Sequence, residues 1–517
     1  MSLLCQAQAA APQAIYMVMV DRFHNGDPSN DADANPADPI AFHGGDLRGI
    51  EQKLGHIQDL GFTQIWMSPI AKMRTEPIGE HGAFHGYWVE DGSRLEPRFG
   101  EPEDLEALTA QMDRMGMAPV LDLVTNHVGP DTPLVQAKPQ WFHGRGDVVD
   151  WSDTEQRITH DVHGLPDLAQ EIPQVTQHLI AEAKIWRAGQ YPVRLDAVRH
   201  LPPSFVRAYR DAISTPTAPA VVYGEIFEGN PIRLAQQARE YGLNHTFDFP
   251  LHYALVEVFC RGGDARALAT TLSADASYGP DHTHLTFLDN HDLPRIRTAC
   301  GGDESKVAAA MDLMLALRGT PVVTYGTEAG LAGQTETQAR ADMDFNRTAP
   351  VAAVIKAGLA RRLAHPSLAS APTVIASATQ DSLEMIRPAS DHTLVVRWSR
   401  QSGVSVSSKV GSDERVPDTA IVVPLAVPKV PLPDGSTLWL SGSSEALGGW
   451  DSARAMGPLK PGGTVKLEIP WGTAVATKLL IKTEDGQETW ASGPNQTHVL
   501  GVKTGRPQTQ KLRWPAP

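Results

Sequence analysis

The sequence has few cysteines and no long apolar run. Its 517 residues include three cysteines, Cys5, Cys260 and Cys300. Three scattered cysteines are too few for a disulfide scaffold or a zinc site, and the sequence leaves open whether Cys260 and Cys300 pair. No apolar stretch reaches the roughly 20 residues that a membrane-spanning helix needs. We therefore expect a globular protein with no membrane partner.

Positive charge is also scarce. The chain has 45 Lys and Arg against 60 Asp and Glu, a formal net charge of −15. A net negative chain lacks the electrostatic footprint that phosphate backbones attract, so a nucleic-acid partner is disfavoured. With 41% hydrophobic and 20% charged residues, the composition is that of a folded protein. The length predicts about three domains, one of them barrel-sized, and we expect a monomer.

Residues 3–12 resemble the end of a secretory signal, because apolar residues are followed by a run of small ones. The basic segment that normally comes first is missing, and an ordinary N-terminus is the alternative interpretation. We expect export, either to the extracellular space or to a periplasm.

Short β-rich runs alternate with amphipathic helical stretches through the first 365 residues. The eight runs are residues 15–20, 62–70, 118–124, 191–197, 220–226, 244–250, 284–290 and 320–328. Eight strand–helix alternations predict an α/β fold, a (β/α)8 TIM barrel formed by residues 12–127 and 174–365. Residues 128–173 form a long connection after the third strand, which we treat as an inserted domain because connections of that length are usually functional.

The helical periodicity stops after the barrel. We assign residues 366–425 to a small β-sandwich domain and residues 433–517 to a second all-β domain. Between them, residues 423–435 have the proline spacing of a semi-rigid linker. Five of the 11 tryptophans fall in the last domain.

Carboxylates end three of the predicted strands. Arg194 and Asp196 alternate on one face of the fourth strand, and in a barrel that face is the lumen. Glu225 ends the fifth strand and Asp292 follows the seventh, and the carboxyl ends of barrel strands meet at one site. Clustered carboxylates give an anion beside a protonated acid, the apparatus of retaining glycoside hydrolysis. Taken singly, each carboxylate has a simpler interpretation as the cap of the next helix.

Four segments in chain order resemble the signature regions of the alpha-amylase family of glycoside hydrolases. They are residues 122–127 (DLVTNH), 193–200 (VRLDAVRH), 224–227 (GEIF) and 287–292 (FLDNHD). Residues 85–88 (HGYW), 165–168 (LPDL) and 319–328 add to the match, which covers the whole barrel.

The resemblance implies a role for each matching residue. Asp196 is the expected nucleophile, Glu225 the general acid/base and Asp292 the carboxylate that stabilises an oxocarbenium-like transition state. Arg194 is expected to orient the nucleophile. Phe84 stands where many relatives carry a stacking Tyr, so it keeps the aromatic face without the phenol. The other expected substrate-binding residues are His85, Tyr87, His127, Arg199, His200 and His291.

The resemblance also implies calcium, which takes oxygen ligands from several places. Asn126, Asp167 and the backbone carbonyl of His200 match the family's inter-domain calcium site. A second, N-terminal loop resembles one in cyclodextrin glucanotransferases, although such stretches are more often solvated turns. Its expected ligands are Asn25, Asp27, Asn30, Asp31, Gly44 and Asp46. We expect one or two calcium ions.

Residues 438–451 and 478–495 resemble a starch-binding module of carbohydrate-binding family 20. The implied starch-binding residues are Trp450, Lys478, Trp490 and Asn495. The alternative for tryptophans in β sequence is core packing, which we expect for Trp439 and Trp471.

These resemblances favour an exported, calcium-dependent endo-hydrolase of α-1,4-glucosidic bonds that binds starch and releases linear maltooligosaccharides. A cyclodextrin glucanotransferase is the enzymatic alternative. The inserted loop is short for one, and the chain has no room for an extra immunoglobulin-like domain. A non-catalytic starch-binding protein is disfavoured because nothing would keep the like charges of the carboxylates together.

Overall fold

The computed structural model describes residues 14–187, 189–217, 219–390, 392–410, 420–502 and 509–514. The signal-like residues 3–12, with Cys5, lie outside the described residues. Within these ranges no helix has the length and apolarity to cross a membrane.

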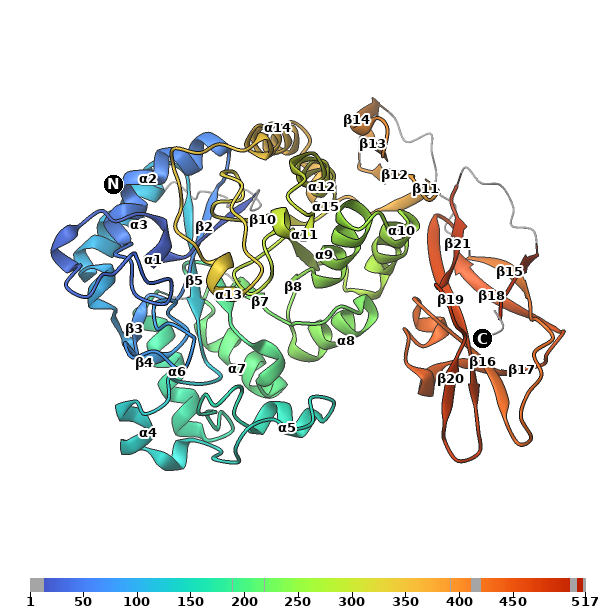
Figure 1. Ribbon diagram of the computed structural model, residues 1–517, viewed down its shortest axis with the longest axis horizontal. Coiled ribbons are helices and arrows are strands. Elements are labelled where there is room, and N and C mark those ends of the chain that lie inside the picture. The colour runs from blue at the N-terminus through green and yellow to red at the C-terminus, as the bar shows by residue number, and fades with distance from the viewer. Residues whose placement is uncertain are drawn as a thin grey trace.

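Eight parallel strands close into a barrel in the order β1-β10-β9-β8-β7-β6-β5-β2, which confirms the predicted TIM barrel (Figure 1). Each strand overlaps one of the predicted β-rich runs, because a strand buried on both faces is a short apolar run. The strands are β1 (Ile15–Val18), β2 (Gln64–Met67), β5 (Ala118–Leu123), β6 (Val193–Leu195), β7 (Val222–Gly224), β8 (His245–Phe247), β9 (Thr283–Thr286) and β10 (Thr320–Thr324).

Helices surround the barrel, and polar side chains begin several of them. Asp46 accepts a hydrogen bond from Gly49 N at the start of α2, and Asn230 caps α8 in the same way. The main helices are α2 (Leu47–Leu60), α3 (Pro102–Arg114), α6 (Pro173–Ile185), α7 (Pro203–Ile213), α8 (Pro231–Tyr241), α9 (Phe249–Leu255), α10 (Arg266–Ser273), α12 (Glu304–Ala316) and α14 (Pro350–Ala364). Shorter ones are α1 (Val20–Phe23), α11 (Ile296–Ala299), α13 (Glu336–Ala339) and α15 (Ser367–Ser370).

The inserted segment between β5 and α6 contains the short helices α4 (Pro133–Ala137) and α5 (Thr154–Thr159). A β-bridge between His127 and Asp167 joins it to the end of β5. A two-stranded sheet of β3 (Ala71–Met73) and β4 (Val89–Leu95) also projects from the barrel. Cys260 and Cys300 form a disulfide, which answers the question that the sequence left open.

A four-stranded antiparallel sheet follows the barrel. It consists of β11 (Val374–Ala378), β12 (Ser382–Pro388), β13 (His392–Ser399) and β14 (Gly403–Val410). Trp398 packs on Phe259 of the barrel, with ring centroids 4.9 Å apart. The predicted small β-sandwich is therefore, in the described residues, this single sheet.

The last domain has two facing sheets around one apolar core. Its strands are β15 (Ala420–Ala426), β16 (Thr437–Gly442), β17 (Met456–Leu459), β18 (Thr464–Pro470), β19 (Thr473–Lys482), β20 (Glu488–Trp490), β21 (Gln496–Leu500) and β22 (Gln510–Lys511). The strand β15 corrects our boundary at residue 425 and the start of the linker at residue 423. It pairs with β18 along its whole length and buries Val423 and Leu425 in the core of the last domain.

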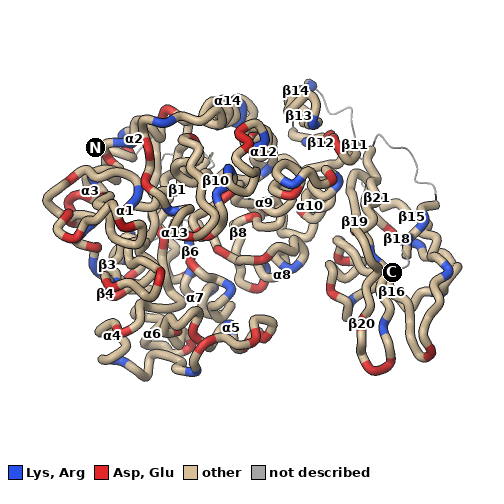
Figure 2. The backbone as a smooth tube through the Cα atoms, in the orientation of Figure 1, with Lys and Arg blue, Asp and Glu red and all other residues tan. Residues whose placement is uncertain are grey.

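The last domain contacts the barrel through several polar bonds. Asn230 Nδ2 donates to Gly449 O at 2.7 Å, and Ala474 N donates to Ser273 Oγ at 2.8 Å. Lys and Arg are interspersed with Asp and Glu over the barrel, without a continuous basic stripe in this view (Figure 2).

Candidate active site

Arg194 holds three carboxylates at the carboxyl ends of adjacent barrel strands. Its Nη1 lies 2.9 Å from Asp122 Oδ1 and 2.6 Å from Asp196 Oδ1, and its Nη2 lies 2.7 Å from Glu225 Oε1. The guanidinium is buried, so these charge-assisted bonds are little screened by water. The second Asp122 oxygen accepts from Trp66 Nε1 and from the Tyr87 hydroxyl, both at 2.8 Å. Asp196 and Glu225 therefore share one cation.

Glu225 has the electrostatics of a proton donor. Burial raises the pKa of its carboxyl to about 7, because the effects of burial and of nearby Asp196 and Asp292 exceed that of Arg194. Ala197 N donates to the other Glu225 oxygen at 3.1 Å, and Ala197 has a left-handed backbone (φ 49°). Glu225 is therefore substantially protonated near neutral pH.

The pKa of Asp292 is shifted in the opposite direction from that of Glu225. Burial alone would raise the pKa of this carboxyl, but His291, Arg340 and Arg194 outweigh it and hold the pKa below its usual value. Arg340 Nη2 lies 2.9 Å from Asp292 Oδ1, and His291 Nε2 lies 3.2 Å from Oδ2. An anion thus lies near the protonated Glu225, which is the separation of pKa values that acid-base chemistry uses.

A cavity of about 470 Å³, within the range of small-molecule sites, opens beside Asp196 and Asp292. Six predicted residues line it: His85, Tyr87, His127, Asp196, His291 and Asp292. Seven more lining residues were not predicted as site residues: Ile78, His81, Trp88, His163, Leu165, Glu336 and Arg340. Trp88 and Leu165 lie within the matched motifs, which could have pointed to them.

The buried histidines of the cavity are neutral near pH 7. Burial lowers the pKa of His85 and His127, and it lowers that of His291 to about 3. The Tyr87 ring stacks parallel to His291, with centroids 5.1 Å apart. Neutral imidazoles donate and accept single hydrogen bonds, which suits sugar hydroxyls.

Four predicted substrate-binding residues do not line this cavity: Phe84, Arg194, Arg199 and His200. The predicted acid/base Glu225 is not in the lining either, and contacts Arg194. Phe84 is 2% exposed, and the Arg22 guanidinium carbon lies 3.6 Å from its ring centroid. The expectation that Phe84 stacks on a sugar is therefore corrected: its face is covered by a cation. Arg199 Nη1 donates to Phe227 O at 2.9 Å, and His200 Nδ1 lies 3.0 Å from Arg157 O, so both contact neighbouring loops.

The first predicted calcium site has ligands to offer. Asn126 Oδ1 and Asp167 Oδ1 are buried, and neither has a hydrogen-bond partner among the described residues. His143 Nδ1 lies 2.6 Å from the other Asp167 oxygen. Buried oxygens without partners are costly unless a cation meets them. Asn126 and Asp167 thus fit a calcium ion, although the described residues contain no group of three or more His, Cys, Asp or Glu placed to hold a metal.

The second predicted calcium loop fits in part. Asn30 Oδ1 and Asp31 Oδ1 are also buried and without partners among the described residues, and Gly44 lies against Asn25 and Asp31. Two of the other expected ligands, Asp46 and Asp27, are already bound by protein groups. Asp46 accepts from the backbone N–H groups of residues 26, 27 and 49, and Asp27 pairs with Arg48 at 2.6 Å.

The predicted starch-binding residues all belong to the last domain. Trp450 and Trp490 are half-buried and absent from its apolar core, so the interpretation as core residues is not supported. Lys478 Nζ donates to Gly493 O at 2.8 Å, and Asn495 is exposed. Trp439 and Trp471, which we expected in the core, are half-buried as well. Trp439 pairs with Leu480 on β19, and Trp490 pairs with the same residue from the other side.

Comparisons with known proteins identify the families of the barrel and of the last domain. The family model of the alpha-amylase catalytic domain matches residues 17–139 and 132–356, and that of the starch-binding domain matches residues 421–510. A beta/alpha-amylase of Paenibacillus polymyxa is 33% identical over 358 residues, 65% of this chain and 29% of that protein. A cyclomaltodextrin glucanotransferase of Klebsiella oxytoca is 30% identical over 61% of this chain and 58% of that protein. The chain thus spans less than two thirds of both relatives.

Solved structures are similar over most of the chain. An alpha-amylase from Geobacillus thermoleovorans, complexed with acarbose, has a TM-score of 0.68 and 28% identity, covering 91% of this chain and 98% of its own. A three-domain cyclomaltodextrin glucanotransferase, CldA, has a TM-score of 0.70 at 24% identity, covering 90% of this chain and 98% of its own, and shows the fold alone. The chain belongs to the alpha-amylase family of glycoside hydrolases and carries a C-terminal starch-binding domain.

Proposed function

We propose that this enzyme hydrolyses internal α-1,4-glucosidic bonds of starch and related glucans with retention of configuration, releasing linear maltooligosaccharides. The observation that carries the proposal is the pairing of Asp196 and Glu225 on the Arg194 guanidinium at 2.6 and 2.7 Å. Two carboxyls that contact one guanidinium can act on the same glycosidic bond. Retaining hydrolysis needs such a pair, one carboxyl as the nucleophile and the other as the acid/base.

Each carboxylate has one role in the proposed reaction. Glu225, protonated near pH 7, donates its proton to the glycosidic oxygen as the bond to the leaving chain breaks. Asp196 attacks the anomeric carbon and forms a glycosyl-enzyme ester. Glu225 then removes a proton from water, which displaces Asp196 and regenerates both groups. Asp292, held ionised by the cations Arg340 and Arg194, opposes the positive charge that develops on the sugar ring.

Substitution of the two carboxylates tests the roles. Glu225→Gln should lower kcat on soluble starch by about 10²- to 10⁴-fold, the usual contribution of a general acid. Asp196→Asn should lower it at least as much, because no covalent intermediate forms. Both variants should melt like the wild type. Near-wild-type turnover in either variant would refute the assignment.

A cyclodextrin glucanotransferase remains the second candidate, because such an enzyme is 30% identical to this chain. The expected immunoglobulin-like domain is not required for that activity, since CldA is a cyclomaltodextrin glucanotransferase with a three-domain ABC distribution. Chromatography of a starch digest separates the two. We expect linear maltooligosaccharides, and cyclodextrins as main products would favour the transferase.

We further propose that the enzyme works outside the cytoplasm, as a monomer, with bound calcium. The Cys260–Cys300 disulfide supports export, since disulfides persist in oxidising compartments. Asn126, Asp167 and the His200 carbonyl would hold one ion, and the N-terminal loop a second. When bound, the first ion supplies a structural cross-link between the inserted segment and the barrel.

A further inference from the structure

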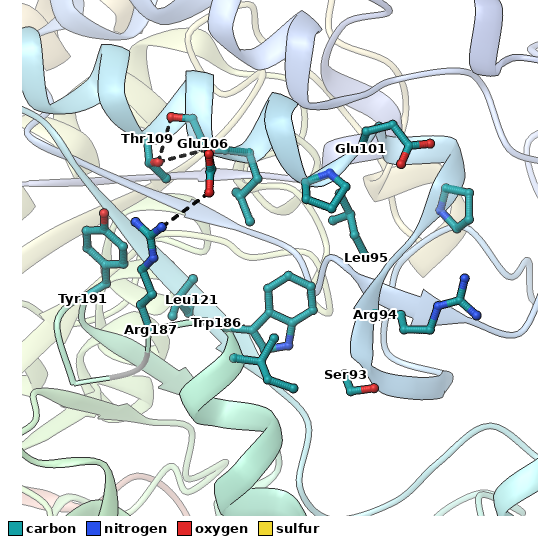
Figure 3. A pocket seen from close by; sticks show the side chains of 15 residues that line it. Ser93, Arg94, Leu95, Glu101, Glu106, Thr109, Leu121, Trp186, Arg187 and Tyr191 are labelled. Atoms are coloured by element: carbon teal, nitrogen blue, oxygen red, sulfur yellow. Dashed lines mark hydrogen bonds and ion pairs between the residues drawn. The ribbon is translucent and has the colours of Figure 1, made fainter.

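A second cavity, of about 420 Å³, opens on the flank of the barrel between β4, α3 and the turn after α6 (Figure 3). It shares no lining residue with the catalytic cavity. Its volume lies within the range of small-molecule sites. Aliphatic side chains, two aromatic rings and charged groups all contribute to its lining.

Trp186 presents an apolar surface to this cavity. Its Nε1 donates to Gly92 O at 2.7 Å, so the polar edge of the indole is satisfied by the protein. Figure 3 shows the indole in the middle of the lining, between Arg187 and Leu95, with Tyr191 beyond Arg187. Aromatic faces of this kind pack on the C–H faces of sugar rings.

The charged groups of the lining balance. Arg187 Nη2 lies 3.6 Å from Glu106 Oε1, and both side chains are more than half exposed, at 52% and 70%. Arg94 and Glu101 lie toward the other end of the cavity (Figure 3). Two cations and two anions favour a neutral ligand, whose hydroxyls donate to carboxylates and accept from guanidinium groups.

Arg187 has a left-handed backbone, with φ at 59°. This conformation is costly for any residue with a Cβ, and glycine would adopt it freely. The turn nevertheless carries an arginine whose side chain reaches across to α3. Arg187 follows the C-cap Trp186 of α6, where helices commonly end with one left-handed residue, so the turn sets the direction of the Arg187 side chain.

We propose that this cavity binds glucosyl units of an α-glucan, as a carbohydrate site separate from the catalytic cavity and from Trp450 and Trp490. The proposal rests on the proposed function for the choice of glucan. The rings of Trp186 and Tyr191 stack on the sugar, while Arg187 and Glu106 bind its hydroxyls.

Equilibrium dialysis with labelled maltotriose tests the site. The background is Glu225→Gln with Trp450→Ala and Trp490→Ala, which slows turnover and removes the tryptophans proposed to bind starch. We expect a second maltotriose per chain beyond the one in the catalytic cavity. Arg187→Gly and Tyr191→Ala should each weaken that second event about tenfold. Asp131→Gly is the matched control, because Asp131 has the same φ of 59° and does not line the cavity.

Arg187→Gly separates a binding role from a structural one. A structural role predicts an unchanged or higher melting temperature together with unchanged binding, because glycine relieves the strained turn. The proposed role predicts the same melting behaviour with loss of the second maltotriose. Binding of only one maltotriose, or unchanged binding in both variants, overturns the proposal. Starch hydrolysis by the wild-type enzyme is measured in parallel, so failure of the proposed function is seen separately.

Discussion

Asn230 joins the segment between β7 and α8 to the starch-binding domain. Its Nδ2 donates to Gly449 O, next to Trp450, while its Oδ1 caps α8 by accepting from Ile232 N at 3.0 Å. The residue lies five positions after Glu225, so one amide connects the segment that follows Glu225 to the loop that carries Trp450.

Replacing Asn230 with Asp should loosen this contact and spare the helix. A carboxylate still caps α8, but it cannot donate, and it repels the Gly449 carbonyl. We expect a larger radius of gyration in solution scattering and several-fold slower hydrolysis of raw starch granules, because the effective concentration of the barrel at the granule falls.

Hydrolysis of soluble maltooligosaccharides by Asn230→Asp should be unchanged. The control is Asp303→Asn, which makes the reverse exchange of Asp and Asn at the N-cap of α12. Equal granule activity in wild type and Asn230→Asp would show that the contact has no role.

The raised pKa of Glu225 predicts the alkaline limit of activity. Its acid form is needed for proton donation, and it is lost as pH rises through about 7 rather than through the ordinary value near 4.5. The pH profile of kcat/KM should therefore fall above a pKa of about 7. In Asp292→Asn the residual activity should fall at lower pH, because a negative charge that raises the pKa is gone. A limit near pH 4.5 in the wild type would contradict this account.

The barrel could be predicted because its buried strands are short apolar runs separated by amphipathic helices. The strand β15 was missed because Pro424 suggested a linker. Among the described residues, β15 pairs with β22 only at Leu425 and Ala426, so Pro424 there has β18 as its one strand partner, a position where proline is tolerated.

The site residues could also be predicted only in part from the sequence. The carboxylates follow strand ends and could be predicted from that pattern. Arg340 comes from a loop 48 residues after Asp292, and no local pattern connects the two. Phe84 was misjudged because Arg22, 62 positions earlier in the chain, covers its ring. Contacts between distant loops depend on the closed barrel and are invisible in one sequence.

Calcium should stabilise the fold. An ion that binds only the native state adds about 2.7 kcal/mol when it is present at 100 times its Kd, so excess chelator should lower the melting temperature by several degrees. Asp167→Asn should behave in calcium as the wild type does in chelator. Glu155→Gln, in the same inserted segment and with a side chain 75% exposed, is the control. A melting curve that chelator leaves unchanged would count against both sites.

Binding to starch granules should depend on Trp450 and Trp490. Starch is neutral, so the net charge of −15 cannot attract the enzyme to it. Attraction must come from aromatic faces that stack on glucose rings, and we expect Lys478 and Asn495 to bind the hydroxyls. In the double variant Trp450→Ala, Trp490→Ala, the fraction of enzyme that sediments with raw granules should fall by about tenfold or more. The variant should still hydrolyse a short soluble maltooligosaccharide at the wild-type rate.

Trp439→Ala is the matched control, because Trp439 is a half-buried indole that flanks Leu480 from the strand opposite Trp490. If Trp439→Ala releases the enzyme from granules as the double variant does, or if the double variant still sediments, stacking on these two tryptophans is not the basis of granule binding.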